Sequence, residues 1–81
     1  MAKVIFPSNL TLYTNGIKEV EVAAGKYQDM VVELHHRFPA LTPVIIEKHA
    51  IAIDGIIIQT PLLETFDQDS EILLIARIAG G

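Results

Sequence analysis

The sequence has 81 residues, a formal net charge of −4 and a pI near 5.1, and 51% of its residues are hydrophobic. A chain of this length supports a single hydrophobic core, so we expect one domain. The acidic balance argues against nucleic acid as a partner, because nucleic-acid binding depends on basic surface. The lack of cysteine excludes disulfides, thiolate metal ligands and a thiol relay within this sequence.

Short apolar runs and the first residues together predict a cytoplasmic protein. The longest apolar runs, such as Ile72 to Ala76, are far shorter than the roughly 18 residues that a membrane-spanning helix requires. Met1 to Val4 lack the apolar core and cleavage site of a secretion signal. We therefore expect no membrane association, no bound metal or cofactor, and a monomer when the protein is free.

The first part of the chain predicts two strands. Residues 3–6 are a β-branched and aromatic run that ends at Pro7, and residues 17–23 alternate apolar and polar side chains. Between them, the turn signal Asn15-Gly16 favours a tight hairpin that pairs residues 10–14 with the second strand.

One helix is predicted, from Lys26 to Phe38, where the hydrophobic period becomes helical. Pro39 ends it. Because Lys26 cannot accept hydrogen bonds from backbone N–H groups, we expect Gly25 to serve as a weak N-cap and this end to fray. The residues predicted to form its core-facing stripe are Tyr27, Met30, Val31, Leu34 and Phe38.

The second half of the chain predicts three more strands. Residues 49–53 and 56–58 flank Asp54-Gly55, a strong hairpin signal, and a polar turn leads into a last strand over residues 71–77. The resulting order, β-β-α-β-β-β, predicts a two-layer α+β domain in which one helix covers one face of a mostly antiparallel sheet. The other face is left open, and the apolar excess of the composition predicts that it binds partners.

The end of the sequence resembles the MoaD/ThiS family of ubiquitin-like sulfur carriers. Residues 65–81 match the family pattern of an acidic turn, an apolar strand and a terminal Gly-Gly. Ile53-Asp54-Gly55 is similar to the family's Val-Asn-Gly hairpin, and Thr60-Pro61-Leu62 to its Thr-Pro-Leu. The resemblance implies a β-grasp fold over residues 1–77, with one helix on a mixed four- to five-stranded sheet, and a flexible tail over residues 78–81.

The resemblance also implies the chemistry. The chain would be a protein cosubstrate, not an enzyme, and its reactive group would be the terminal carboxylate of Gly81. An E1-like adenylating enzyme would use ATP to activate Gly81, and a sulfur donor enzyme would convert the adenylate to a thiocarboxylate. A downstream synthase would accept the sulfur. The tail residues Ile78, Ala79 and Gly80 would bind in the active-site tunnel of a partner enzyme, and glycine suits such a tunnel because a Cβ would collide with its walls.

The pathway that receives the sulfur stays open at this point. Ala76-Arg77 stands where molybdopterin-type members often have Pro-Pro, which weakens a role as the small subunit of molybdopterin synthase. The opening segments, Phe6-Pro7-Ser8-Asn9-Leu10 and Tyr13-Thr14-Asn15-Gly16, are more similar to the members that supply cysteine synthesis. The same resemblance favours an irregular loop over residues 10–14 instead of a strand. Homocysteine, thiazole and tRNA remain alternative destinations of the sulfur.

Alternation from the last strand onwards divides the side chains into two sets, one containing Leu73, Ile75 and Arg77, and one containing Ile72, Leu74 and Ile78. Burying an unpaired charge is costly, so Arg77 favours the first set as the partner-binding sheet face.

Two alternatives keep the same fold but change the function. The tail could instead be joined to lysines of target proteins, as ubiquitin is, or the domain could be a plain binding module whose glycines are incidental. Neither a metal site nor an acid–base site is expected, because His35 and His36 project about 100° apart on the helix and His49 has no accompanying nucleophile motif.

Overall fold

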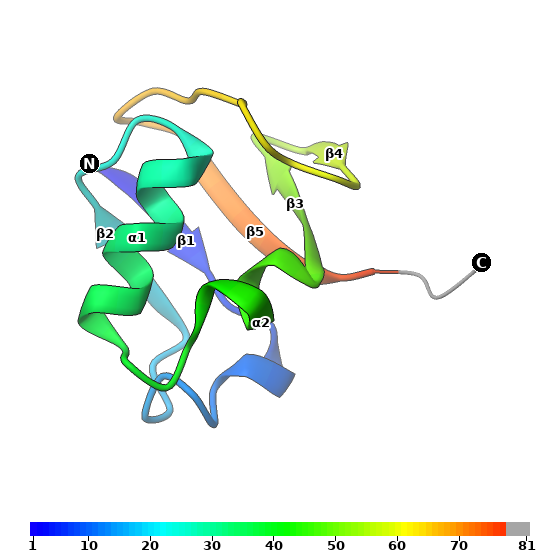
Figure 1. The fold of residues 1–81 in the computed structure, drawn as a ribbon. Coiled ribbons are helices and arrows are strands. Elements are labelled where there is room, and N and C mark those ends of the chain that lie inside the picture. Colours follow the sequence, from blue (N-terminus) through cyan, green and yellow to red (C-terminus); the bar gives the residue numbers. More distant parts are fainter. Residues whose placement is uncertain (78–81) are drawn as a thin grey trace.

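The structure is a computed structural model that describes residues 1–77 (Figure 1). Residues 78–81, the predicted tail, lie outside the described residues. No helix in the described part is long and apolar enough to cross a membrane. Besides a short 3-10 turn at Ser8–Leu10, the elements are β1 (Ala2–Ile5), β2 (Glu19–Val22), α1 (Tyr27–Arg37), α2 (Pro43–Glu47), β3 (His49–Ile53), β4 (Ile56–Ile58) and β5 (Glu71–Ala76).

The five strands form one mixed sheet in the order β2-β1-β5-β3-β4. β1 and β5 are parallel, and the other neighbouring pairs are antiparallel. The first and last strands of the chain therefore lie side by side at the centre. Figure 1 shows both helices on the same face of the sheet, so the predicted two-layer α+β architecture is confirmed.

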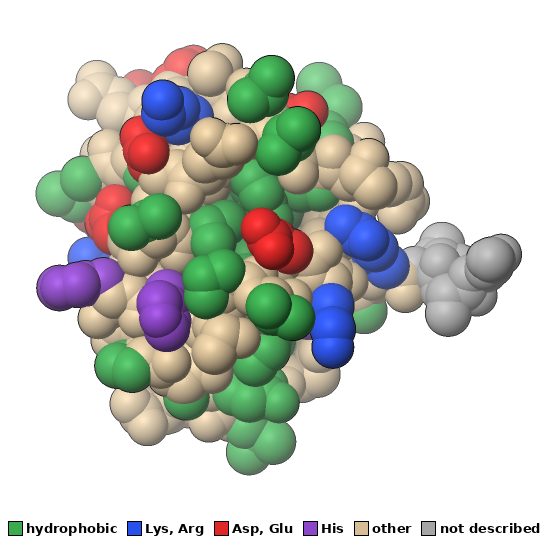
Figure 2. All heavy atoms as spheres, viewed as in Figure 1, with side chains coloured by type: hydrophobic (Ala, Val, Ile, Leu, Met, Phe, Trp, Pro, Cys, Tyr) green, Lys and Arg blue, Asp and Glu red, His purple; other side chains and the backbone are tan. Residues whose placement is uncertain are grey.

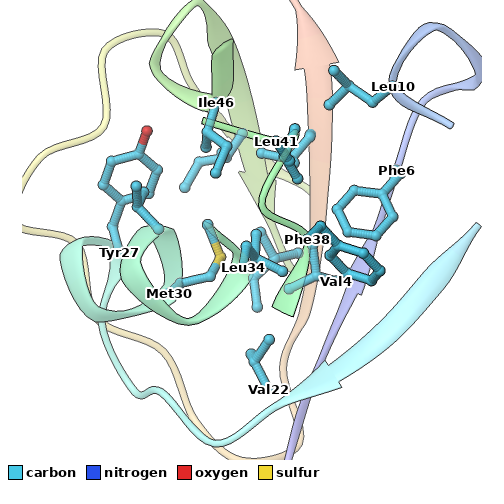
Figure 3. Packing of buried hydrophobic residues seen from close by; sticks show 14 of the residues in the cluster. Val4, Phe6, Leu10, Val22, Tyr27, Met30, Leu34, Phe38, Leu41 and Ile46 are labelled. Carbon is cyan, nitrogen blue, oxygen red and sulfur yellow. The ribbon is translucent and has the colours of Figure 1, made fainter. Parts of the chain in front are cut away.

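The core fills the space between α1 and the sheet, as Figure 3 shows. The predicted stripe of α1 is buried as expected, and Phe38 meets Phe6 edge to face at a centroid distance of 5.8 Å. From β5, Ile72 and Leu74 point into this core, since they are almost completely buried.

The segment between β1 and β2 is an irregular loop, as the family resemblance favours, so the hairpin over residues 10–14 that Asn15-Gly16 alone predicts does not form. The Asn15-Gly16 turn does form, with φ of 57° and 82°, and the Ile17 amide donates to the Thr14 carbonyl at 3.0 Å. However, Leu10 and Thr14 are buried, which holds the segment against the core and away from the sheet.

The start of α1 corrects the prediction about its cap. Lys26, not Gly25, is the N-cap, and its side chain makes no capping hydrogen bond. Instead, the Tyr27 amide donates to the Glu64 carbonyl and the Phe66 amide to the Gly25 carbonyl, both at 2.9 Å. The backbone of residues 64–66 thus replaces the missing side-chain cap.

A second helix, α2, was not predicted. Thr42 is its N-cap, with Oγ1 accepting from the Ile45 amide at 3.3 Å, and Pro43 occupies the first turn. This Thr-Pro pair is a helix-start signal, but five residues are too few to show a hydrophobic period. α2 buries Ile46 and closes the core beside β3.

The predicted hairpin of β3 and β4 is confirmed, with φ of 50° at Asp54 and 87° at Gly55. Asp54 also binds the start of β5, because its Oδ1 accepts from the Glu71 amide and its own amide donates to the Glu71 carbonyl, each at 2.9 Å.

Candidate functional site

β5, the strand that leads to the Gly-Gly sequence, is held from both sides. It pairs with β1 through residues 71–73 and with β3 through residues 72–76. Backbone pairing on both edges makes a strand resistant to local opening. The backbone of the chain is therefore held in place by strand pairing as far as Ala76.

The face of the sheet away from the helices carries an apolar surface, which we call the open face. The register aligns Ile57, Ala52, Leu73 and Ile5 across four strands in one row, and Ala50 and Ile75 lie beside it. Ala50 and Ala52 are nearly buried although they face outward, because larger neighbours cover such short side chains. The open face therefore comprises Ile5, Ala50, Ala52, Ile57, Leu73 and Ile75.

Charged side chains border the open face where β5 begins. The register places Lys3 between Glu71 and Glu21, and Lys3 Nζ lies 3.6 Å from a carboxylate oxygen of Glu19. These side chains are exposed. An apolar centre beside a polar rim is the usual anatomy of a protein–protein interface.

The structure brings two of the three predicted sheet-face residues together. Leu73 and Ile75 are half-buried on the open face, whereas Ile72 and Leu74 face the core. Arg77 lies beyond the end of β5 and is exposed, so strand alternation does not fix its face. The predicted tail sites, namely Ile78, Ala79, Gly80 and Gly81, lie outside the described residues.

Sequence reasoning missed the contributions of Ile5, Ile57 and the two alanines to the open face. The alternation of small and large residues in His49-Ala50-Ile51-Ala52-Ile53 was a usable signal for β3, since alanine suits a crowded face. No local pattern indicates that Ile5 and Ile57 share a row, because only the pairing of distant strands aligns them.

His35 and His49 take part in hydrogen bonds, and Nδ1 of His35 lies 3.2 Å from the Leu41 carbonyl oxygen. His49 is buried, its Nδ1 lies 2.9 Å from the Ile45 carbonyl, and its Nε2 lies 3.3 Å from Asn9 Nδ2. A neutral ring protonated at Nδ1 satisfies both contacts. Within residues 1–77, no group of three or more potential ligands from His, Asp and Glu is placed to hold a metal ion.

Comparison with solved structures gives a match over the whole chain. The CysO chain of the Amycolatopsis orientalis BexX/CysO complex superposes with a TM-score of 0.83, covering 100% of both chains at 15% identity. The chain has the ubiquitin-like β-grasp fold. At that identity the likeness shows the fold alone.

A second β-grasp structure is closer in sequence. Small archaeal modifier protein 1 (SAMP1) of Methanosarcina acetivorans matches with a TM-score of 0.72 and 26% identity, over 99% of this chain and 95% of the modifier. Both similarities agree with the resemblance to ubiquitin-like sulfur carriers in the sequence. No model of a known protein family matches the sequence, and no curated protein matches it.

Proposed function

We propose that this β-grasp protein is a sulfur carrier that works through the carboxylate of Gly81. The observation that carries the proposal is the combination of a central, doubly paired β5 with the Gly80-Gly81 sequence that follows it. The fold shared with CysO and the family pattern over residues 65–81 support the same function.

The proposed chemistry begins by making the carboxylate reactive. A carboxylate oxygen of Gly81 attacks the α-phosphorus of ATP on an E1-like partner, forming an acyl adenylate and releasing pyrophosphate. Hydrosulfide delivered by a sulfur donor enzyme then attacks the carbonyl carbon, so that a C–S bond forms as the C–O bond to AMP breaks. The thiocarboxylate sulfur then displaces a leaving group from an electrophilic carbon of an acceptor on a downstream synthase, and hydrolysis of the acyl–sulfur bond regenerates the Gly81 carboxylate.

In this proposal the open face is the surface that the activating partner recognises. Leu73 and Ile75 lie on the strand that leads into the tail, so an enzyme that binds them also receives the residues that follow. The BexX/CysO complex shows that a β-grasp protein of this shape binds another protein. A few well-packed residues near the centre of an interface typically carry most of its binding energy.

Two measurements test the proposal on the full chain. Intact-mass analysis of the protein isolated from its host should show a form in which one oxygen is replaced by sulfur, with Gly81 as the last residue. Incubation with the cognate activating enzyme and ATP should release pyrophosphate, and a variant lacking Gly81 should release none while its thermal unfolding is unchanged. Failure of both measurements on the intact chain would refute the assignment.

A second function, protein modification, is favoured by the 26% identity to SAMP1. In that case the activated Gly81 would form an isopeptide bond with lysine side chains of other proteins. Immunoblots of cells that express a tagged chain would then show a ladder of larger species that disappears when Gly81 is deleted. A thiocarboxylate without such a ladder would favour the sulfur carrier.

A further inference from the structure

A groove crosses the helix side of the molecule, on the opposite layer from the open face. It runs between α1, α2 and the loop that follows β4, and has a volume of about 320 Å³. Figure 2 shows hydrophobic side chains gathered on this side, with acidic side chains among them. The residues that line this helix-side groove are Tyr27, Gln28, Val31, Val32, Pro43, Glu47, Pro61 and Leu62.

Large apolar side chains stand exposed along the groove. Val32 is 67% exposed and Leu62 is 59% exposed, and both line it. Val44 and Leu63, which neighbour lining residues in the chain, are also exposed. The lining residues Val32, Pro43 and Leu62 come from three separate segments and thus present one apolar surface, and such a surface typically marks an interaction site.

The groove also contains an unsatisfied polar group. Tyr27 is 3% exposed, and its hydroxyl is covered without a hydrogen-bond partner among residues 1–77. Figure 3 shows the hydroxyl pointing away from Met30 and Leu34. Buried polar groups are nearly always hydrogen-bonded, so this hydroxyl is a polar group of the groove with hydrogen-bonding capacity left for a ligand.

Two carboxylates and one guanidinium act on this hydroxyl. Burial raises the pKa of Tyr27 most, Glu47 raises it further, Arg77 lowers it, and Glu64 raises it least. Of these three charged residues, Glu47 is the one that lines the groove. The Glu47 carboxylate lines the groove and forms no ion pair within residues 1–77. Glu64 is partly engaged, since its Oε1 accepts from the Leu62 amide at 2.6 Å. A ligand that complements this site is therefore basic.

We propose that the helix-side groove binds an extended, basic peptide segment of a partner protein. An apolar side chain of the peptide lies against Val32 and Leu62, a lysine or arginine pairs with Glu47, and a backbone group hydrogen-bonds the Tyr27 hydroxyl. The groove and the open face lie on opposite layers, so one molecule can hold this peptide while an activating enzyme holds the sheet. This proposal does not depend on the sulfur chemistry of Gly81.

The proposal is tested by peptide selection. A library of random dodecapeptides displayed on phage is presented to the immobilised full chain, and the phage that bind are sequenced. The selected peptides should combine basic and apolar residues, and should shift the amide resonances of residues 27–32, 43–47 and 61–64. Val32→Lys should weaken their binding roughly tenfold or more, because it adds a like charge and removes apolar contact. Leu12→Lys, at a residue 87% exposed in the distant β1–β2 loop, is the matched control and should leave binding unchanged.

Two further variants separate binding from folding. Glu47→Gln should weaken binding and flatten its salt dependence, because it removes the ion pair. Tyr27→Phe should weaken binding about threefold or more without lowering the melting temperature.

Several outcomes would overturn the proposal. The first is that the library yields no peptide that combines basic and apolar residues. The second is that Ile57→Lys on the open face weakens peptide binding whereas Val32→Lys does not. The third is that the Tyr27→Phe variant binds the selected peptides as tightly as the parent protein does. Sedimentation that reveals a dimer dissociated by Val32→Lys would instead assign the groove to a second copy of the chain.

Discussion

Tyr27 combines a buried aromatic ring with a hydroxyl that lacks a partner within residues 1–77. An unsatisfied buried hydroxyl typically costs about 1–3 kcal/mol, while the ring itself packs in the core. We therefore expect Tyr27→Phe to raise the free energy of unfolding by about 1 kcal/mol in urea denaturation at neutral pH. Tyr13→Phe, at a more exposed tyrosine, is the control and should change it by less than about 0.5 kcal/mol.

The same residue predicts an alkaline effect on stability. Burial, followed by the charge of Glu47, raises the pKa of the Tyr27 hydroxyl above its ordinary value of 10.0. The unfolded chain then loses this proton at a lower pH than the folded protein does, so the stabilisation is complete below pH 10 and is lost as the pH rises towards the folded pKa. Unfolding free energies measured from pH 8 to 11 should fall more steeply for the parent than for Tyr27→Phe, and equal slopes would contradict the prediction.

Among the secondary-structure elements, α1 and the end of β2 are joined by one carboxylate. The Ala23 amide donates to both carboxylate oxygens of Glu33, and the Ala24 amide donates to one of them, all at 3.0 Å. Arg37, one turn further along, donates to the Glu21 carbonyl at 2.8 Å. These contacts satisfy backbone groups near the edge strand that strand pairing leaves free.

Removing this carboxylate should therefore loosen the edge of the sheet. Glu33→Ala is expected to lower the free energy of unfolding by about 2 kcal/mol, because hydrogen bonds to a charged acceptor are stronger than neutral ones. Amide hydrogen exchange at Ala23 and Ala24 should accelerate as well. Glu19→Ala, which removes only an exposed ion pair with Lys3, should cost less than about 0.5 kcal/mol, and equal losses in the two variants would argue against the link.

Elements with a strong local signal could be predicted from the sequence, and those fixed by distant contacts could not. Helical spacing identified α1, and Asp54-Gly55 identified the β3–β4 hairpin, because both signals act within a few residues. Asn15-Gly16 forms its turn, yet burial of Leu10 and Thr14 prevents the strand that this turn would otherwise favour. The cap of α1 was missed because its acceptor, the Glu64 carbonyl, lies far along the chain.

The candidate sites show the same limit. Alternation correctly separated Leu73 and Ile75 from the core side of β5, but the rest of the open face depends on the strand register. The helix-side groove was not predicted at all, since Val32 and Leu62 belong to segments that meet only in the folded protein.

For the molecule as a whole, the two layers offer two separate surfaces, and the open face should govern activation. Ile57 is 60% exposed at the β4 end of the apolar row of the open face, so Ile57→Lys should leave the fold intact and raise the KM for the cognate activating enzyme roughly tenfold. Pyrophosphate release measures the effect, and Leu12→Lys, away from both surfaces, is the matched control. An unchanged KM for Ile57→Lys would remove the open face from the activation step.

The parallel pairing of β1 with β5 has a consequence for how the protein is made in the cell. β1 is synthesised well before its central neighbour β5, because the register pairs Lys3 with Glu71, almost 70 residues further along the chain. Until β5 is synthesised, β1 and β3 lack the strand that lies between them in the sheet, and their apolar sides remain uncovered. Native pairing of the central strands therefore waits for β5, so a chain that lacks β5 also lacks the apolar row of the open face.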